Sequence, residues 1–262
     1  MHYELEWQRK RDHGDLIRAL DAGRGRKPIE LKKWVRVCSW RYSDQPLNSY
    51  GSTRGEGGRF NYTDFMDNVD SEPFPALYIG QTRTVAEREF HGYDGGKRGE
   101  LSANDLALLP NRNVSIISLV GHLENYIDLT RTSGLKEFAS IIQTYAVSKR
   151  VTDLAKSAGR PPRVLVNSVK KLLATLYEKN WRGYVMNHGL PSGSQIFGKL
   201  VWEAGYNGIV YRSTKGAGRC IAVFPQNLSD SNTVIRISGD VKKGAIKELN
   251  GHNWQEMTKS SE

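Results

Sequence analysis

Six short runs of apolar, β-branched and aromatic residues along the chain predict β-strands. Each run has the length of a strand and is bounded by polar or glycine-containing segments, as is typical of strands in a globular domain. The runs cover residues 34–42, 76–80, 114–120, 208–211, 220–224 and 234–237.

Three further segments carry apolar residues at helical spacing, namely 135–149, 165–177 and 194–204. In the first of them, Leu135, Phe138 and Ile142 recur every three or four residues, which places them on one face of a helix. Gly205 lies directly after the third segment and favours the end of a helix there. The glycine and two prolines within 158–162 predict a break between the first two helices.

The predicted helices cluster in the middle of the sequence, with strands on both sides of them. This distribution favours an α+β domain over a regular alternation of strands and helices. Residues 1–33 are rich in charge and predict a partly helical leader, and residues 229–262 predict a strand followed by a polar tail.

The composition is that of a folded domain, with 38% hydrophobic and 10% aromatic residues in a chain of 262. No apolar run approaches the roughly 18–20 residues needed to span a bilayer, and the first residues do not resemble a signal peptide. Cys38 and Cys220 are the only cysteines, and the six histidines form no pair at metal-ligand spacing. We therefore expect a cytoplasmic protein without a metal site or a disulfide framework.

The chain is basic, with a formal net charge of +10, and this favours an anionic partner. Nucleic acid, a phosphate-bearing substrate and an acidic protein all fit that charge. The densest basic cluster, Arg24, Arg26 and Lys27, lies in a glycine-rich loop. A nucleic-acid-binding module without catalysis is therefore the competing functional class, although we find no helix-turn-helix, zinc-ligand or RNP-type motif.

The glycine-rich stretch at 51–58 lacks the Gly-Lys-Ser/Thr of a P-loop, and no strand–Gly-x-Gly-x-x-Gly–helix unit is present. It does present Arg59 directly after Gly57 and Gly58. Glycines let the backbone turn tightly or approach a ligand closely, and the planar guanidinium of an arginine suits a pyrophosphate. Arg59 is therefore a candidate phosphate-binding residue.

Residues 76–90 predict a strand that contains Tyr78 and then a short helix with two glutamates. Thr84 and Glu87 have capping-box spacing, so Glu87 is expected to satisfy the start of the helix. Glu89 follows Val85 by four positions and therefore lies on the apolar side of that helix. A carboxylate on that side requires a partner, which makes Glu89 the better site candidate, with Glu87 as the alternative.

A predicted strand at 208–211 delivers Ser213 at its exit. No histidine or lysine motif accompanies this serine, so we do not interpret it as the nucleophile of a hydrolase.

Taken in order, these segments resemble the RES family, which is named for its Arg, Glu and Ser residues. The resemblance covers about residues 34–228, the expected main domain, with a helical insertion at about 121–190. Phe60 stands where the family usually has Trp, and Arg212 where it usually has Pro. The matching elements are Trp34-Val35-Arg36-Val37, Gly57-Gly58-Arg59-Phe60-Asn61, Ala76-Leu77-Tyr78-Ile79 with the helix leading to Glu89, and Gly205 through Ser213.

The resemblance implies an ADP-ribosyltransferase-like α+β fold with a split, mixed or antiparallel sheet and flanking helices. It also implies an enzyme that consumes NAD⁺ by breaking its nicotinamide–ribose bond, with water, phosphate or a protein side chain as the acceptor. Family members are toxins that are commonly paired with an Xre-type antitoxin, so a cognate antitoxin or immunity protein is an expected partner.

The resemblance assigns catalysis to Glu89, Arg36 and Ser213 and dinucleotide binding to Arg59, Tyr78 and Arg41. Arg41 is the alternative to Arg36. If both arginines belong to one regular strand, they face opposite sides because they are five residues apart, and only one of them should face a given cleft.

Overall fold

The structure is a computed structural model that describes residues 2–66, 72–92, 113–159 and 165–260. It contains a curved sheet of eight strands in the order β4-β5-β6-β2-β1-β3-β7-β8. Only the β4–β5 pair is parallel, and every other neighbouring pair is antiparallel. The strands are β1 (Ile29–Ser39), β2 (Leu77–Gly80), β3 (Val114–Leu123), β4 (Tyr126–Asp128), β5 (Gly208–Arg212), β6 (Arg219–Val223), β7 (Val234–Ile237) and β8 (Glu248–Leu249).

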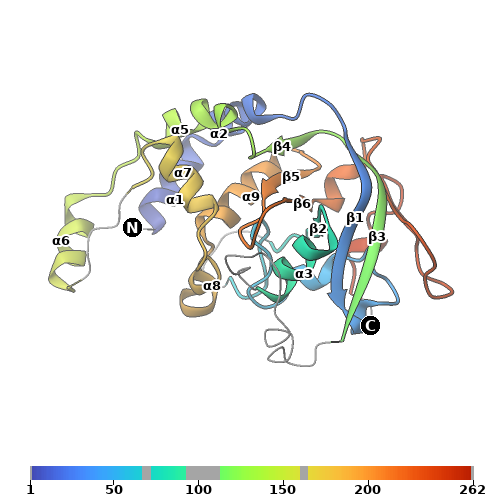
Figure 1. Ribbon diagram of the computed structural model, residues 1–262. Helices are drawn as coiled ribbons and strands as arrows, with labels where there is room; N and C mark the ends of the chain where they lie inside the picture. The colour runs from blue at the N-terminus through green and yellow to red at the C-terminus, as the bar shows by residue number, and fades with distance from the viewer. Residues whose placement is uncertain (1, 67–71, 93–112, 160–164, 261–262) are drawn as a thin grey trace.

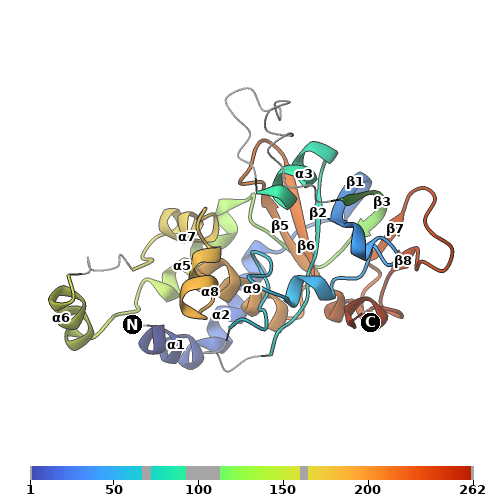
Figure 2. The same cartoon turned by 90° about the horizontal axis from the view of Figure 1, so that it is seen from below.

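Most of the helices are gathered on one side of the molecule, while α3 lies apart from them against β1 and β2 (Figures 1 and 2). The predicted α+β class with a mixed sheet is confirmed. The helices are α1 (His2–Arg11), α2 (His13–Leu20), α3 (Arg83–His91), α5 (Lys136–Ile142), α6 (Lys149–Ser157), α7 (Val169–Leu176), α8 (Arg182–His188) and α9 (Gly193–Glu203).

The single helix predicted over 135–149 is wrong, because the helix ends at Ile142 and the next one begins only at Lys149. Helix α5 ends at Ile142, and the Thr144 hydroxyl then donates to the carbonyl of Ile141, 2.7 Å away. Such a side-chain bond to the backbone competes with continued helix. Helix α6 begins anew after Ser148, whose hydroxyl accepts from the amide of Val151. Of the predicted break at 158–162, residues 160–162 lie outside the described part of the chain.

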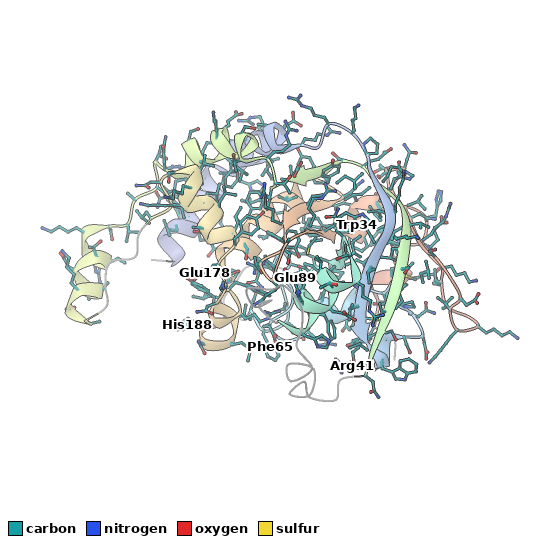
Figure 3. The ribbon with its side chains drawn as sticks, viewed as in Figure 1. Trp34, Arg41, Phe65, Glu89, Glu178 and His188 are labelled. Carbon is teal, nitrogen blue, oxygen red and sulfur yellow. The ribbon has the colours of Figure 1, made fainter. Side chains whose placement is uncertain are left out.

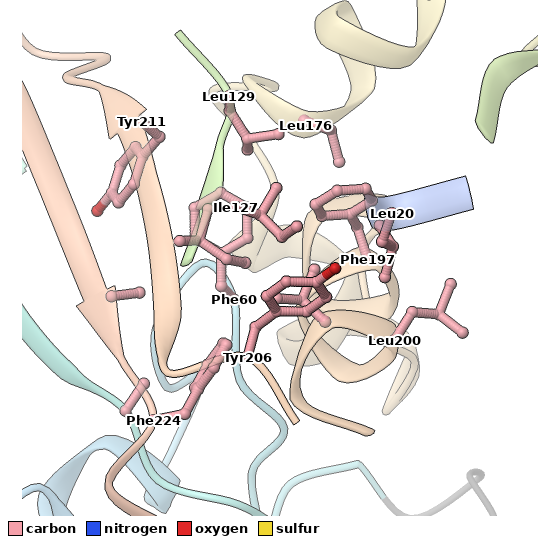
Figure 4. Packing of buried hydrophobic residues seen from close by; sticks show 14 of the residues in the cluster. Leu20, Phe60, Ile127, Leu129, Leu176, Phe197, Leu200, Tyr206, Tyr211 and Phe224 are labelled. Atoms are coloured by element: carbon pink, nitrogen blue, oxygen red, sulfur yellow. The ribbon is translucent and has the colours of Figure 1, made fainter. Parts of the chain in front are cut away.

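The hydrophobic core lies on both faces of the sheet, because alternate residues of a strand face opposite sides. In β6, Cys220 and Ala222 face the helices, whereas Ile221 and Val223 face the other layer. Helices α2, α7 and α9 cover the first face, where aromatic and aliphatic side chains interlock (Figure 4). The labelled residues of this cluster are Leu20, Phe60, Ile127, Leu129, Leu176, Phe197, Leu200, Tyr206, Tyr211 and Phe224.

Helix α2, within the predicted leader, contributes to this core through Leu16, Ala19 and Leu20, which are almost completely buried. Strand β1 begins at Ile29, five residues before the predicted start of the strand. At the other end of the chain, Met257 is buried, and its carbonyl accepts from Ser49. Among the described helices, none has both the length and the apolar character required to cross a membrane.

Candidate functional site

A cleft of about 630 Å³ opens beside the middle strands of the sheet. Its walls come from β1, β2, α3, the loop that contains Gly57 and Gly58, and the segment before α8. Of the residues predicted to form the site, five line this cleft directly: Arg36, Arg41, Arg59, Tyr78 and Glu89. The sixth, Ser213, is hydrogen-bonded to Glu89.

Glu89 lies on the inner side of α3, in the turn that follows the buried Val85 and Ala86. Its Oε1 accepts from the Ser213 hydroxyl at 2.6 Å and from the Thr214 amide at 2.9 Å. Both donors belong to the loop after β5, so this loop fixes the position of the carboxylate. Oε2 has no hydrogen bond to any described residue, and Glu89 remains half-buried in the cleft wall.

Glu87 lies on the outer side of the same helix, where its Oε1 accepts from Nε of Arg83 at 2.8 Å. The predicted capping box between Thr84 and Glu87 is wrong. The N-cap is Thr82, whose hydroxyl accepts from the amide of Val85, so the helix starts two residues earlier than the capping-box spacing implied. The preference for Glu89 over Glu87 therefore agrees with the geometry, since Glu89 lines the cleft and Glu87 does not.

Arg36 extends from β1 into the cleft, where two carbonyls orient its guanidinium. Nη2 donates to the carbonyl of Asn48 at 2.9 Å, and Nη1 to that of Tyr78 at 3.4 Å. Nε is buried and has no hydrogen-bond partner. Burial lowers the pKa of Arg36, but an arginine stays charged in a protein. Because no carboxylate pairs with it in the described part of the chain, Arg36 offers a net positive charge to the cleft.

Arg59 is 5% exposed and joins the glycine loop to the end of α7. Nη1 donates to the carbonyls of Leu176 and Glu178 at 3.1 and 2.9 Å, and Nη2 donates to the Thr214 hydroxyl at 3.2 Å. A cation at a helix C-terminus also interacts favourably with the helix dipole. Burial lowers the pKa of Arg59, and its Nε has no hydrogen-bond partner. This arginine therefore stabilises the cleft wall as well as lining it.

The Tyr78 hydroxyl holds the glycine loop in place. It accepts from the amide of Phe60 at 2.9 Å and donates to Oδ1 of Asn61 at 2.8 Å. A Cβ on Gly58 would lie 2.2 Å from the Tyr78 ring, so only glycine permits this approach. Burial raises the pKa of Tyr78 well above its ordinary value, which keeps the hydroxyl protonated as a donor.

The prediction that only one of Arg36 and Arg41 faces the cleft is wrong, because both of them line it. Strand β1 ends at Ser39, and residues 40–42 form a 3₁₀ turn, so the strand alternation does not extend to Arg41. The Arg41 guanidinium lies over the ring of Tyr42, 4.7 Å from its centroid. Arg36 and Arg41 are thus two separate cations of one cleft.

Sequence reasoning missed the contribution of the helical segment to the cleft. Lys179 and Trp181 line it from the connection between α7 and α8, and Arg182 lines it from the first turn of α8. The buried Trp181 ring contacts two guanidinium groups, with its centroid 5.6 Å from that of Arg59 and 4.5 Å from that of Arg182. The adjacent Trp181 and Arg182 were visible in the sequence as a possible cation–aromatic pair. Their place in the cleft wall depends on the contact between Trp181 and the distant Arg59, which no local sequence pattern predicts.

The cleft is strongly cationic and is therefore suited to a ligand with several negative charges. Its two lining glutamates are both engaged, since Nε of Arg182 lies 3.3 Å from Glu56 Oε1 and Glu89 is bonded to the Ser213 loop. No group of three or more potential metal ligands occurs in the described part of the chain. The lining cations are Arg36, Arg41, Arg54, Arg59, Lys179, Arg182 and Lys215.

No protein-family model matches the sequence, and no curated protein matches it either. Among solved structures, a chain of the M. tuberculosis MbcT–MbcA toxin–antitoxin complex aligns with this protein at a TM-score of 0.43 and 14% sequence identity. The alignment covers 93% of this chain and 97% of that chain.

Proposed function

We propose that this protein is a RES-type enzyme that consumes NAD⁺ by breaking the bond between nicotinamide and ribose. The observation that supports this most is the single cleft in which Arg36, Arg59, Tyr78 and Glu89 meet, with Ser213 bound to Glu89. These residues come from distant parts of the sequence, and they are the ones on which the resemblance to the RES family depends.

The chemistry of the bond fits these side chains. Cleavage of an N-glycosidic bond passes through an oxocarbenium-like state that is positive at the ribose. The Glu89 carboxylate stabilises that charge and can hold a ribose hydroxyl through Oε2, while Ser213 and Thr214 keep Oε1 in place. Nicotinamide leaves as a neutral molecule, so the site does not need a strong general acid.

The cationic groups suit the pyrophosphate of the dinucleotide. Arg36 and Arg59 each have a buried Nε without a partner, and both line the cleft. No carboxylate pairs with either guanidinium in the described part of the chain, so both offer a positive charge that attracts the phosphate groups of a ligand. Tyr78 then maintains the approach of the glycine loop to the ligand, since its hydroxyl binds Phe60 and Asn61.

The biological role that accompanies this activity in the RES family is that of a toxin with an Xre-type antitoxin. We extend this to the present chain as part of the proposal, with action in the cytoplasm and a cognate antitoxin or immunity protein as partner. Water, phosphate and a protein side chain remain the three candidate acceptors of the ribosyl group.

Purified protein incubated with NAD⁺ tests the activity and identifies the acceptor. Release of nicotinamide is followed with and without phosphate, and the second product is identified by mass. ADP-ribose indicates hydrolysis, a product heavier by one phosphate indicates phosphorolysis, and ADP-ribosylated protein indicates transfer. Absence of nicotinamide release under all three conditions, with an added cell extract as the source of protein acceptors, would contradict the proposal.

In that case the nucleic-acid-binding alternative is tested next. Its surface would be an open groove of about 610 Å³ on another part of the molecule, lined by Arg24, Arg26, Lys27 and Arg131. Affinity for DNA or RNA that falls steeply with added salt would support that function.

A further inference from the structure

We infer that the cleft accepts a dinucleotide with an additional phosphate on the adenosine ribose, so that NADP⁺ is a substrate as well as NAD⁺. This inference rests on the proposed function and concerns the end of the cleft opposite Glu89. The feature that carries it is Arg41, a cation of the cleft wall that the proposed chemistry does not use.

The two ends of the cleft differ in chemistry. Glu89 lies near the centre of the molecule, whereas Arg41 lies at its lower margin (Figure 3). Arg36 lines the same cleft from β1, five residues before Arg41 in the sequence. If the scissile bond lies at Glu89 and the pyrophosphate at Arg36, the adenosine part extends toward Arg41.

The Arg41 side chain is arranged to bind a phosphate. Its guanidinium lies over the Tyr42 ring, which packs so closely on Gly51 that a Cβ there would lie 3.0 Å from it. Stacking on a fixed ring orients the planar group and leaves the N–H donors at its edge available for a bidentate contact. No hydrogen bond or ion pair of Arg41 occurs in the described part of the chain, and the side chain is exposed.

Carboxylates that would reject an added phosphate are engaged elsewhere. Asp44 is bonded to Nζ of Lys242 at 2.5 Å, and Asp64 to Arg54 at 2.7 Å. Neither aspartate lines the cleft. In Rossmann folds, a carboxylate binds the ribose 2′-hydroxyl of NAD, whereas an arginine accommodates the 2′-phosphate of NADP. The chemistry at Arg41 is of the second kind.

The added phosphate is remote from the bond that breaks, so the reaction at Glu89 is the same for both dinucleotides. The test compares kcat/KM for nicotinamide release from NAD⁺ and from NADP⁺ in the full-length protein and in Arg41→Gln. Arg26→Gln, which removes an equally exposed arginine outside the cleft, is the matched control.

We expect the wild type to cleave both dinucleotides with similar efficiency. In Arg41→Gln, the ratio of kcat/KM for NADP⁺ to that for NAD⁺ should fall about 10-fold, the effect of one lost charge-assisted hydrogen bond. Arg26→Gln should leave this ratio unchanged. Cleavage of NAD⁺ with NADP⁺ more than about 100-fold poorer, or an unchanged ratio in Arg41→Gln, overturns the inference while the proposed function stands.

If neither dinucleotide is cleaved, the proposed function itself fails. A binding measurement then tests the 2′-phosphate subsite independently of cleavage. Calorimetry then compares adenosine 2′,5′-bisphosphate with adenosine 5′-monophosphate. Tighter binding of the bisphosphate that is lost in Arg41→Gln supports a 2′-phosphate subsite, and equal binding of the two ligands overturns it.

Discussion

At the scale of single residues, the site depends on one carboxylate held by a distant loop. Ser213 and Glu89 are 124 positions apart in the sequence, yet their side chains form a hydrogen bond of 2.6 Å. A carboxylate accepting a hydroxyl and a backbone amide on the same oxygen has its rotamer fixed, which leaves the second oxygen oriented for a ligand. Ser213 is thus a positioning residue for Glu89.

Replacing Ser213 by Ala should lower kcat about 10-fold with little change in KM, because one of the two hydrogen bonds that orient Oε1 is lost. Steady-state kinetics of nicotinamide release measure both constants. Ser213→Thr retains the hydroxyl and should recover most of the lost turnover. A rise in KM with unchanged kcat in Ser213→Ala would instead indicate a direct contact of Ser213 with the substrate.

The sequence made Glu89 the better candidate for a physical reason that holds in the structure, since its spacing from Val85 and Ala86 places it on the buried side of α3. Its binding to Ser213 could not be predicted from spacing, because nothing local relates α3 to the loop after β5. The resemblance to the RES family named both residues as site candidates, and the structure shows the hydrogen bond between them.

At the scale of elements, the predictions that failed depend on the residues at which strands and helices begin and end. The end of β1 at Ser39 allows Arg41 to line the cleft, and the N-cap of α3 at Thr82 leaves Glu87 without a capping role. Both boundaries depend on a few hydrogen bonds at the ends of elements, where the apolar pattern carries little information. The missed strands β4 and β8 have three and two residues, too few to show an alternation.

Arg59 links three elements and should therefore affect stability as well as binding. In Arg59→Ala, the carbonyls of Leu176 and Glu178 lose their donor, and we expect unfolding to become easier by about 2 kcal/mol. The melting temperature should fall by about 4–8 °C, and KM for NAD⁺ should rise.

Arg54→Ala is the matched control for this prediction, since Arg54 also lines the cleft but is exposed and paired with Asp64 on the surface. Thermal unfolding should change far less in this variant. Equal melting temperatures for Arg59→Ala and the wild type would contradict the structural role of Arg59.

At the scale of the whole molecule, the hydrophobic core consists of separate clusters on the two faces of the sheet. Six of the eight strands were predicted from apolar runs, because burial on a sheet enforces that pattern. The order of the strands was not predicted, since β1 pairs with both β2 and β3 and β6 lies between β5 and β2. Ionisable groups lie where this core meets the cleft, including Tyr211 and Cys220 of the cluster and Tyr78, which packs against it.

These buried groups predict a loss of stability at alkaline pH. Burial raises the pKa of Tyr78, Tyr211 and Cys220, so the folded protein retains protons that the unfolded chain releases above about pH 8.5 for cysteine and about pH 10 for tyrosine. The unfolded state then binds fewer protons, and the free energy of unfolding falls as the pH rises through this range.

Urea denaturation at intervals from about pH 8 to 11 measures this effect. Tyr211→Phe removes one of the ionisable groups and should make the decline shallower. A free energy of unfolding that stays constant over this range would contradict the conclusion that burial keeps the two hydroxyls and the thiol protonated in the folded protein.

The most direct test of the central claim compares two glutamates of one helix. Glu89→Gln and Glu87→Gln make the same chemical change on α3, but only Glu89 lines the cleft, while Glu87 pairs with Arg83 on the surface. We expect Glu89→Gln to lower kcat for nicotinamide release by about 100-fold or more with NAD⁺ binding largely retained, and Glu87→Gln to behave as the wild type. Near-normal turnover in Glu89→Gln would contradict the account, and a large loss in Glu87→Gln instead would transfer the catalytic role to the other face of the helix.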